Sequence, residues 1–95
     1  MKPVKILEVW QSMDDDNGGV KQIPGHRFFS QTEAKKNGNG WGAPPEPRKV
    51  YVVEMDDGSY WELGDKVGVF KDKDDLTKQF ALSKLTAEER KLLGL

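Results

Sequence analysis

The sequence predicts a small α+β domain, with an antiparallel sheet of three to four strands and a few short helices. Three observations lead to this prediction. In Val50–Leu63, two β-rich runs flank an Asp-Gly pair, which is a strong hairpin signal because a type I′ turn requires positive φ at its central residues. Capping patterns at Ser30 and Thr86 predict helix starts. The 95 residues suit a single domain, covering 1–95.

Four segments are rich in β-branched and aromatic residues, which favour the pleated and partly buried surface of a sheet. A closed turn with Met55 opposite Tyr60 would place Trp61 on the sheet face of Val52 and leave both faces of the hairpin apolar. We therefore expect helices, the loop around Trp41 or a partner chain to cover one face. The predicted strands are Val4–Trp10, Val50–Met55, Ser59–Leu63 and Lys66–Phe70.

Two helical segments follow from capping and charge signals. Ser30 and Glu33 form a capping box, and an Asn-Gly pair ends a short helix near Ser30–Asn37. Asp residues gather at the start of a C-terminal helical segment, Asp72–Leu93, where the helix macrodipole favours negative charge. A second capping box at Thr86 predicts that a new helix begins there.

Two long loops are expected, at 11–27 and 37–48, because neither stretch has apolar periodicity. The first contains the acidic turn Asp14–Gly19, which lacks the third ligand and the distal Glu of an EF-hand calcium loop. It is therefore expected to be a solvated turn without a metal. The second loop carries Trp41 between two glycines. A Trp in such a loop either anchors the loop on the core or presents a recognition side chain.

Composition ranks the possible partners. The chain has 15 basic and 16 acidic residues, whereas a nucleic-acid binder usually has a clear basic excess. The absence of Cys excludes disulfides, a thiolate nucleophile and Cys-based zinc sites. The N-terminal stretch has neither the apolar core of a signal peptide nor the length of a membrane span. We therefore expect a cytoplasmic protein with no membrane partner.

No catalytic constellation is recognisable, so we expect a protein that is not an enzyme and needs no cofactor. His26 stands without a partner that would orient it as a general base. The predicted hairpin register puts Glu54 and Glu62 on opposite sheet faces, which argues against paired carboxylates. The glycine-rich stretch 37–42 has no preceding strand and no following helix, as a phosphate-binding loop would require.

Binding is easier to support, because aromatic and basic residues recur along the chain. Together they could stack and pair with a nucleotide-like molecule, or form a protein-interaction hot spot. The aromatic residues could equally be the core of a domain with few aliphatic residues. The candidate binding residues are Arg27, Trp41, Arg48, Lys49, Tyr51 and Tyr60.

Three functions follow from these residues. The first is a non-catalytic protein-interaction module with a protein partner, self-associating as a homo-oligomer through the sheet or the C-terminal helix. The alternative is a small-ligand binding protein that sequesters a nucleotide-like molecule at an aromatic and basic pocket. The third is a weak nucleic-acid binder.

The chain combines a leading strand and an aromatic hairpin with the segments Phe28–Ser30, Gly40–Gly42 and Leu85–Leu95. In this layout, over most of its length, it resembles small phage- or prophage-type accessory proteins of uncharacterised families. It implies a non-enzymatic role, such as inhibiting or sequestering a host component.

Overall fold

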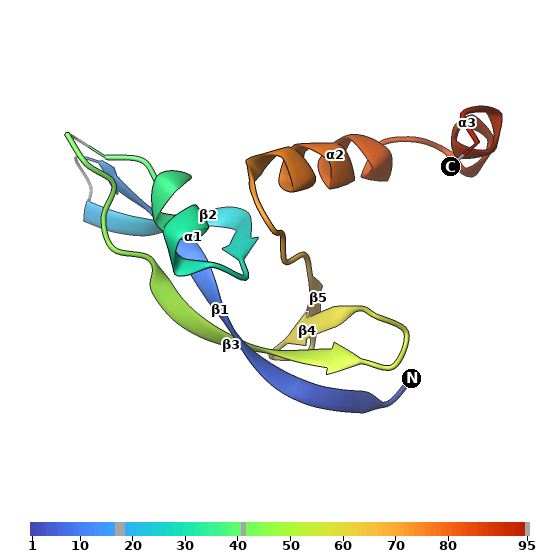
Figure 1. Ribbon diagram of the computed structural model, residues 1–95, viewed down its shortest axis with the longest axis horizontal. Helices are drawn as coiled ribbons and strands as arrows, with labels where there is room; N and C mark the ends of the chain where they lie inside the picture. Colours follow the sequence, from blue (N-terminus) through green and yellow to red (C-terminus); the bar gives the residue numbers. More distant parts are fainter. Residues whose placement is uncertain (17–18, 41, 95) are drawn as a thin grey trace.

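The computed structural model describes residues 1–16, 19–40 and 42–94. These residues form five strands and three helices, which confirms the α+β class and raises the strand count above the three to four expected (Figure 1). The elements are β1 (Pro3–Asp16), β2 (Gly19–Phe28), α1 (Gln31–Lys36), β3 (Arg48–Met55), β4 (Tyr60–Glu62), β5 (Asp65–Val67), α2 (Lys73–Ser83) and α3 (Ala87–Leu92).

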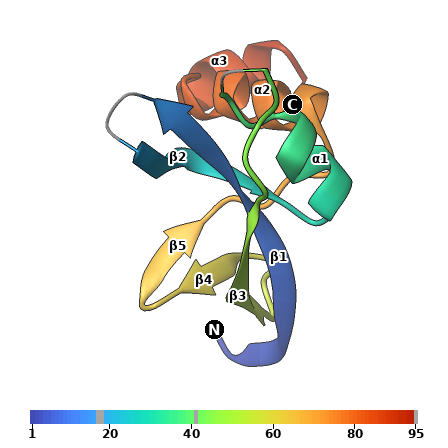
Figure 2. The same cartoon turned by 90° about the vertical axis from the view of Figure 1, so that its left-hand side faces the viewer.

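The strands form one antiparallel sheet in the order β2-β1-β3-β4-β5, organised around the long strand β1. The sheet curls, as strand twist favours, until its two ends meet (Figure 2). The amide of Phe29 donates to the carbonyl of Phe70 at 3.1 Å, and the amide of Phe70 donates to the carbonyl of Arg27 at 2.9 Å. These two bonds join the end of β2 to the segment after β5.

The prediction of a long loop at 11–27 is wrong. The described part of this stretch is a β-hairpin, in which β1 continues to Asp16 and β2 begins at Gly19. A bulge interrupts the pairing next to Gln11, and the buried amide of Gln11 donates to the carbonyls of Ile23 at 2.7 Å and His26 at 3.2 Å. The Gln11 side chain thus takes the place of backbone hydrogen bonds between the two strands at the bulge. A strand pair held in this way does not need alternating apolar residues, and the sequence shows no such alternation here.

The stretch 37–48 is closer to the prediction, since helix and strand are absent from its described residues up to Pro47. Two backbone hydrogen bonds nevertheless hold this stretch against β1. The amide of Asn39 donates to the carbonyl of Met13 at 3.0 Å, and the amide of Asp15 donates to the carbonyl of Asn39 at 2.8 Å. Trp41, predicted as an anchor or a recognition side chain, lies outside the described residues.

The predicted register of the β3–β4 hairpin is also wrong, by one residue. Its loop has three residues, because the amide of Met55 donates to the carbonyl of Ser59 at 2.9 Å and Gly58 takes a positive φ of 86°. Trp61 consequently pairs with Val53. A one-residue shift turns every side chain to the other face. Trp61 therefore lies on the face opposite Val52, the reverse of the prediction.

The helices begin where the capping signals predicted. The Ser30 hydroxyl accepts from the amide of Glu33, and the Asp72 carboxylate accepts from the amide of Asp75 at 2.8 Å. Thr86 and Glu89 form a complete capping box. The C-terminal segment is thus two helices, with a break between Ser83 and Ala87.

The core lies on one face of the curled sheet, called here the inner face. Val9 and Val52 are fully buried there, and Val69 is 8% exposed. Leu7, Val50, Tyr60 and Val67 pack around them. No residue of α2 or α3 is buried, so the described core belongs to the strands, to Val69 in the segment after β5, and to α1, which buries Ala34.

Candidate functional site

The side of the sheet turned away from the core, called here the outer face, carries exposed apolar side chains. Strand side chains alternate between faces, so Ile6 of β1 lies on the same side as Tyr51 of β3. These two side chains are 71% and 58% exposed. Val53 pairs with Ile6 on one side and with Trp61 on the other, which continues the apolar row across three strands.

Helices leave this part of the outer face open. α1 lies over the far end of β1, where its Ala34 carbonyl accepts from the buried Ser12 hydroxyl at 2.6 Å. α2 lies on the inner side, since its residues share the wall of a hollow with Tyr60 and Val67. Figure 1 shows α2 and α3 together on one side of the β1–β3 ribbon, above it in this view.

The outer face has a charged border. Glu8 and Lys49 approach to 3.8 Å between carboxylate and ammonium, and the Lys49 ammonium lies 5.7 Å from the ring centre of Trp10. Both charged side chains are about half exposed, so the ion pair contributes little stability. Its effect is to fix where a positive and a negative group stand beside the apolar row.

A partly buried ion pair lies on the inner side. Arg27 of β2 donates to the carboxylate of Glu62 on β4 at 2.7 Å, with side chains 16% and 21% exposed. The Nε of Arg27 is buried and has no hydrogen-bond partner within the described chain. Glu62 and Glu54 share the inner face, contrary to the prediction of opposite faces, because of the register shift.

Tyr60 occupies the same inner region. Its hydroxyl lies 3.5 Å from the Glu54 carboxylate, and its ring meets the edge of Phe29 at 5.7 Å between centroids. Burial raises the pKa of Tyr60 above its ordinary value, and the charge and hydrogen bond of Glu54 raise this pKa further. Tyr60 therefore stays a neutral phenol in ordinary buffers.

An open groove separates α2 from the sheet and is called here the inner groove. One end is a hollow of about 370 Å³ lined by His26, Phe70, Leu76 and Phe80 among others. The hollow continues into a more polar one of about 680 Å³ along β4 and β5. The two hollows share Phe70 as a wall residue.

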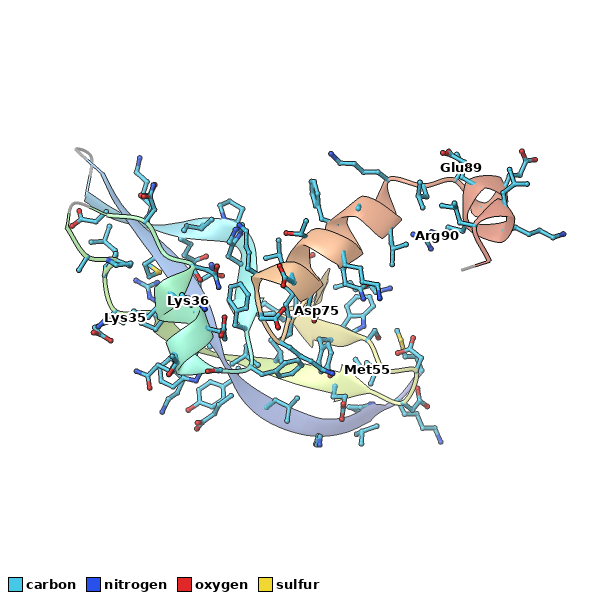
Figure 3. All side chains as sticks on the ribbon, turned by 45° about the horizontal axis from the view of Figure 1, so that its top comes forward. Lys35, Lys36, Met55, Asp75, Glu89 and Arg90 are labelled. Carbon is cyan, nitrogen blue, oxygen red and sulfur yellow. The ribbon has the colours of Figure 1, made fainter. Side chains whose placement is uncertain are left out.

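The charged residues of the polar hollow are mostly acidic. Asp57, Asp75 and Lys66 line it. Hydrogen bonds from the side chain and backbone of Ser59 lower the pKa of Asp57, so this carboxylate stays ionised well into mild acid. Asp75 lies at the end of α2 nearest the sheet (Figure 3). This wall is poorly suited to a phosphate.

The sequence-predicted binding residues do not converge on one site. Lys49 and Tyr51 lie on the outer face, while Arg27 and Tyr60 lie on the inner side. Arg48 is exposed at the start of β3 and pairs with Gln11, which puts it on the side opposite Lys49. Trp41 is not among the described residues.

Sequence reasoning named Tyr51 but missed Ile6, Val53 and Trp61 on the outer face. Alternation along Val4–Trp10 puts Ile6 on the side of Glu8 and Trp10, which was a usable signal. Trp61 was assigned to the wrong face through the register error.

Two further findings concern the described residues. They contain no cluster of three or more His, Cys, Asp or Glu side chains placed to hold a metal ion. None of the helices in these residues has the length and apolar character to span a membrane. No family model matches this chain, and comparison with curated proteins and with solved structures finds no match.

Proposed function

We propose that the protein is a non-catalytic protein-interaction module that binds a protein partner through the outer face. The observation that carries this proposal is the exposure of Ile6 and Tyr51 on an uncovered sheet face. A solvent-facing side of an antiparallel sheet is ordinarily polar, and contiguous exposed apolar side chains mark interaction sites. Tyr51 and Trp61 supply the aromatic anchors that interaction hot spots favour.

The partner surface is expected to be apolar in its centre and charged at its border. The central row runs from Ile6 through Val53 to Trp61. Beside it, Glu8 and Lys49 offer one charge of each sign, which would set the orientation of a partner more than its affinity. A role as an inhibitor or modulator of a host component rests on the resemblance to phage-type accessory proteins and is part of this proposal.

The test compares four baits in capture from the source cell. Wild-type protein should retain a partner that the variants Ile6→Glu and Tyr51→Glu lose, because each places a charge on the exposed apolar part of the outer face. Leu63→Glu is the matched control, since Leu63 is 99% exposed in the β4–β5 turn. Circular dichroism confirms that each variant is folded. Equal capture by all baits would refute binding through the outer face.

A second candidate function is capture of a small ligand in the inner groove. The hollow of about 370 Å³ falls in the size range of small-ligand sites and is walled by Phe70, Leu76 and Phe80. Asp57 and Asp75 in the adjoining hollow disfavour a phosphate, so an uncharged aromatic compound suits the groove better than a nucleotide.

A thermal-shift screen separates the two ligand classes. A compound held well above its Kd raises the midpoint of unfolding by mass action. Uncharged aromatic compounds should raise it, and Phe70→Ala, which opens the wall, should reduce the shift. A shift with nucleotides alone would restore the original prediction of a nucleotide-like ligand, and no shift with either class would remove this candidate.

A further inference from the structure

The C-terminal arm, defined here as residues 71–94 with α2 and α3, is well formed but unpacked. α2 has 11 residues and α3 has 6, and neither buries a side chain. Isolated helices of this length are marginal in water, because nucleation is costly and most helical stability comes from tertiary packing. Phe80, Leu92 and Leu93 are nevertheless 59%, 86% and 63% exposed. The arm therefore has apolar surface that needs a partner.

The size of the unburied surface supports a protein partner. The chain exposes 6759 Å², whereas a compact monomer of this mass exposes about 5,500 Å². Its radius of gyration is 14.9 Å, against about 12 Å for a compact chain of this length. The projecting arm accounts for the extended shape (Figure 1). The excess of about 1,200 Å² exceeds the roughly 800 Å² that each partner buries in a standard interface.

The charge pattern of the arm indicates which partner. α3 carries acidic residues in its first turn and basic residues in its last turn, and α2 likewise begins with Asp74 and Asp75. Where two copies of α3 pair antiparallel about a two-fold axis, the acidic start of one faces the basic end of the other. α2 has no basic residue in its last turn, so this complementarity to a second copy belongs to α3.

Two of the four charged side chains of α3 already make hydrogen bonds within the arm. Glu89 completes the capping box with Thr86. Arg90 reaches back toward α2 and donates to the Leu82 carbonyl at 3.0 and 2.6 Å (Figure 3). Glu88 and Lys91 are exposed, lie three residues apart and therefore share one side of the helix. They are the pair available to a second copy.

We propose that the arm is a homodimerisation element that pairs antiparallel with the arm of a second copy of this chain. The pairing covers Leu92 and Leu93, and it brings Glu88 opposite Lys91 of the partner subunit. Since the arm and the outer face lie on opposite sides of the sheet, the dimer leaves the outer face open. The inference therefore goes beyond the proposed function and does not depend on it.

Light scattering over a concentration series tests the dimer. Wild-type protein should have twice the mass of a single chain, and Leu92→Asp and Leu93→Asp should be monomers. Leu63→Asp, in the turn outside the arm, should remain dimeric, which excludes a general effect of losing an exposed leucine. A wild-type monomer at the highest soluble concentration overturns the proposal, as does a small-angle scattering profile of a compact monomer with the arm folded onto the inner groove.

Charge reversal tests the antiparallel arrangement. Glu88→Lys or Lys91→Glu alone should weaken dimerisation about five- to tenfold, because each puts like charges opposite one another. Mixing the two variants should restore association as a heterodimer, and the double variant should restore the homodimer. The double variant also opposes the helix macrodipole, so an effect on helix stability alone would make it the weakest dimer. That order of affinities would overturn the antiparallel pairing.

Discussion

The sheet body and the C-terminal arm differ in how their structure is stabilised. In the body, Val9, Phe28 and Val52 are fully buried, and they come from three strands that are distant in the sequence. In the arm, both helices have satisfied caps, yet neither buries a side chain. The difference shows that capping determines where a helix begins, whereas burial depends on strand pairings over long sequence distances. Stability is therefore expected to reside in the body and association in the arm.

The largest expected effect contrasts one phenylalanine from each region. Phe28 is fully buried and meets Phe70 across the seam of the curled sheet at 6.4 Å between ring centroids. Phe28→Ala should lower the free energy of unfolding by about 3–5 kcal/mol, because it removes a large side chain and leaves a cavity. Phe80→Ala should change it by less than about 0.5 kcal/mol, as at other exposed sites.

Urea unfolding followed by tryptophan fluorescence measures both variants. The protein concentration should be kept below the dimer dissociation constant, because dimerisation adds to apparent stability. A large loss for Phe80→Ala under these conditions would mean that the arm packs on the body, and the contrast between the two regions would fail.

Most local features of the fold could be predicted from the sequence. The helix starts at Ser30 and Thr86 followed from capping side chains that act on backbone groups three residues away. Long-range features could not. The 11–27 hairpin is held partly by the buried Gln11 side-chain amide. Its sequence has no apolar alternation from which the pairing could be predicted.

The site was less predictable than the fold, because it depends on sheet register. Gly58 takes the left-handed conformation that closes a three-residue loop, whereas a two-residue turn was expected from the same Asp-Gly pair. That single residue decides which face Trp61 and Tyr60 occupy. Residue types alone therefore suggested one aromatic and basic surface, and the observed register separates its members.

The next effect concerns the ion pair that holds β2 to β4 within the body. Glu62→Ala should cost about 2 kcal/mol, because it leaves the largely buried Arg27 without its carboxylate partner. Glu46→Ala is the matched control, since its pair with Lys35 is exposed and should cost less than about 1 kcal/mol. Chemical unfolding at neutral pH measures both, and equal losses would show that burial does not distinguish the two pairs.

A stabilising change is expected in the turn between β4 and β5. Leu63 has a positive φ of 49° and is followed by Gly64 with φ of 87°, a type I′ arrangement that favours Asn-Gly. Leu63→Asn should raise stability by about 1 kcal/mol, because Asn tolerates the left-handed conformation that is unfavourable for Leu. Leu63→Val should lower it, since a β-branched residue is more strained there. Changes of opposite sign in the midpoint of thermal unfolding would confirm that the backbone conformation at position 63 determines the effect of the two substitutions.

The smallest expected effect is a loss of stability at alkaline pH that is linked to Tyr60, on the side of the body that faces the arm. Burial, and then Glu54, raise the pKa of Tyr60 above 10.0 in the folded chain. The stability linked to this phenol is therefore complete below pH 10 and is lost as the pH rises through the raised pKa. Tyr60→Phe should flatten the alkaline fall in stability, measured by urea unfolding between pH 9 and about 11.5. Tyr51→Phe keeps Tyr60 and should leave that fall in place, whereas an unchanged fall in Tyr60→Phe would assign it to another group of the body or arm.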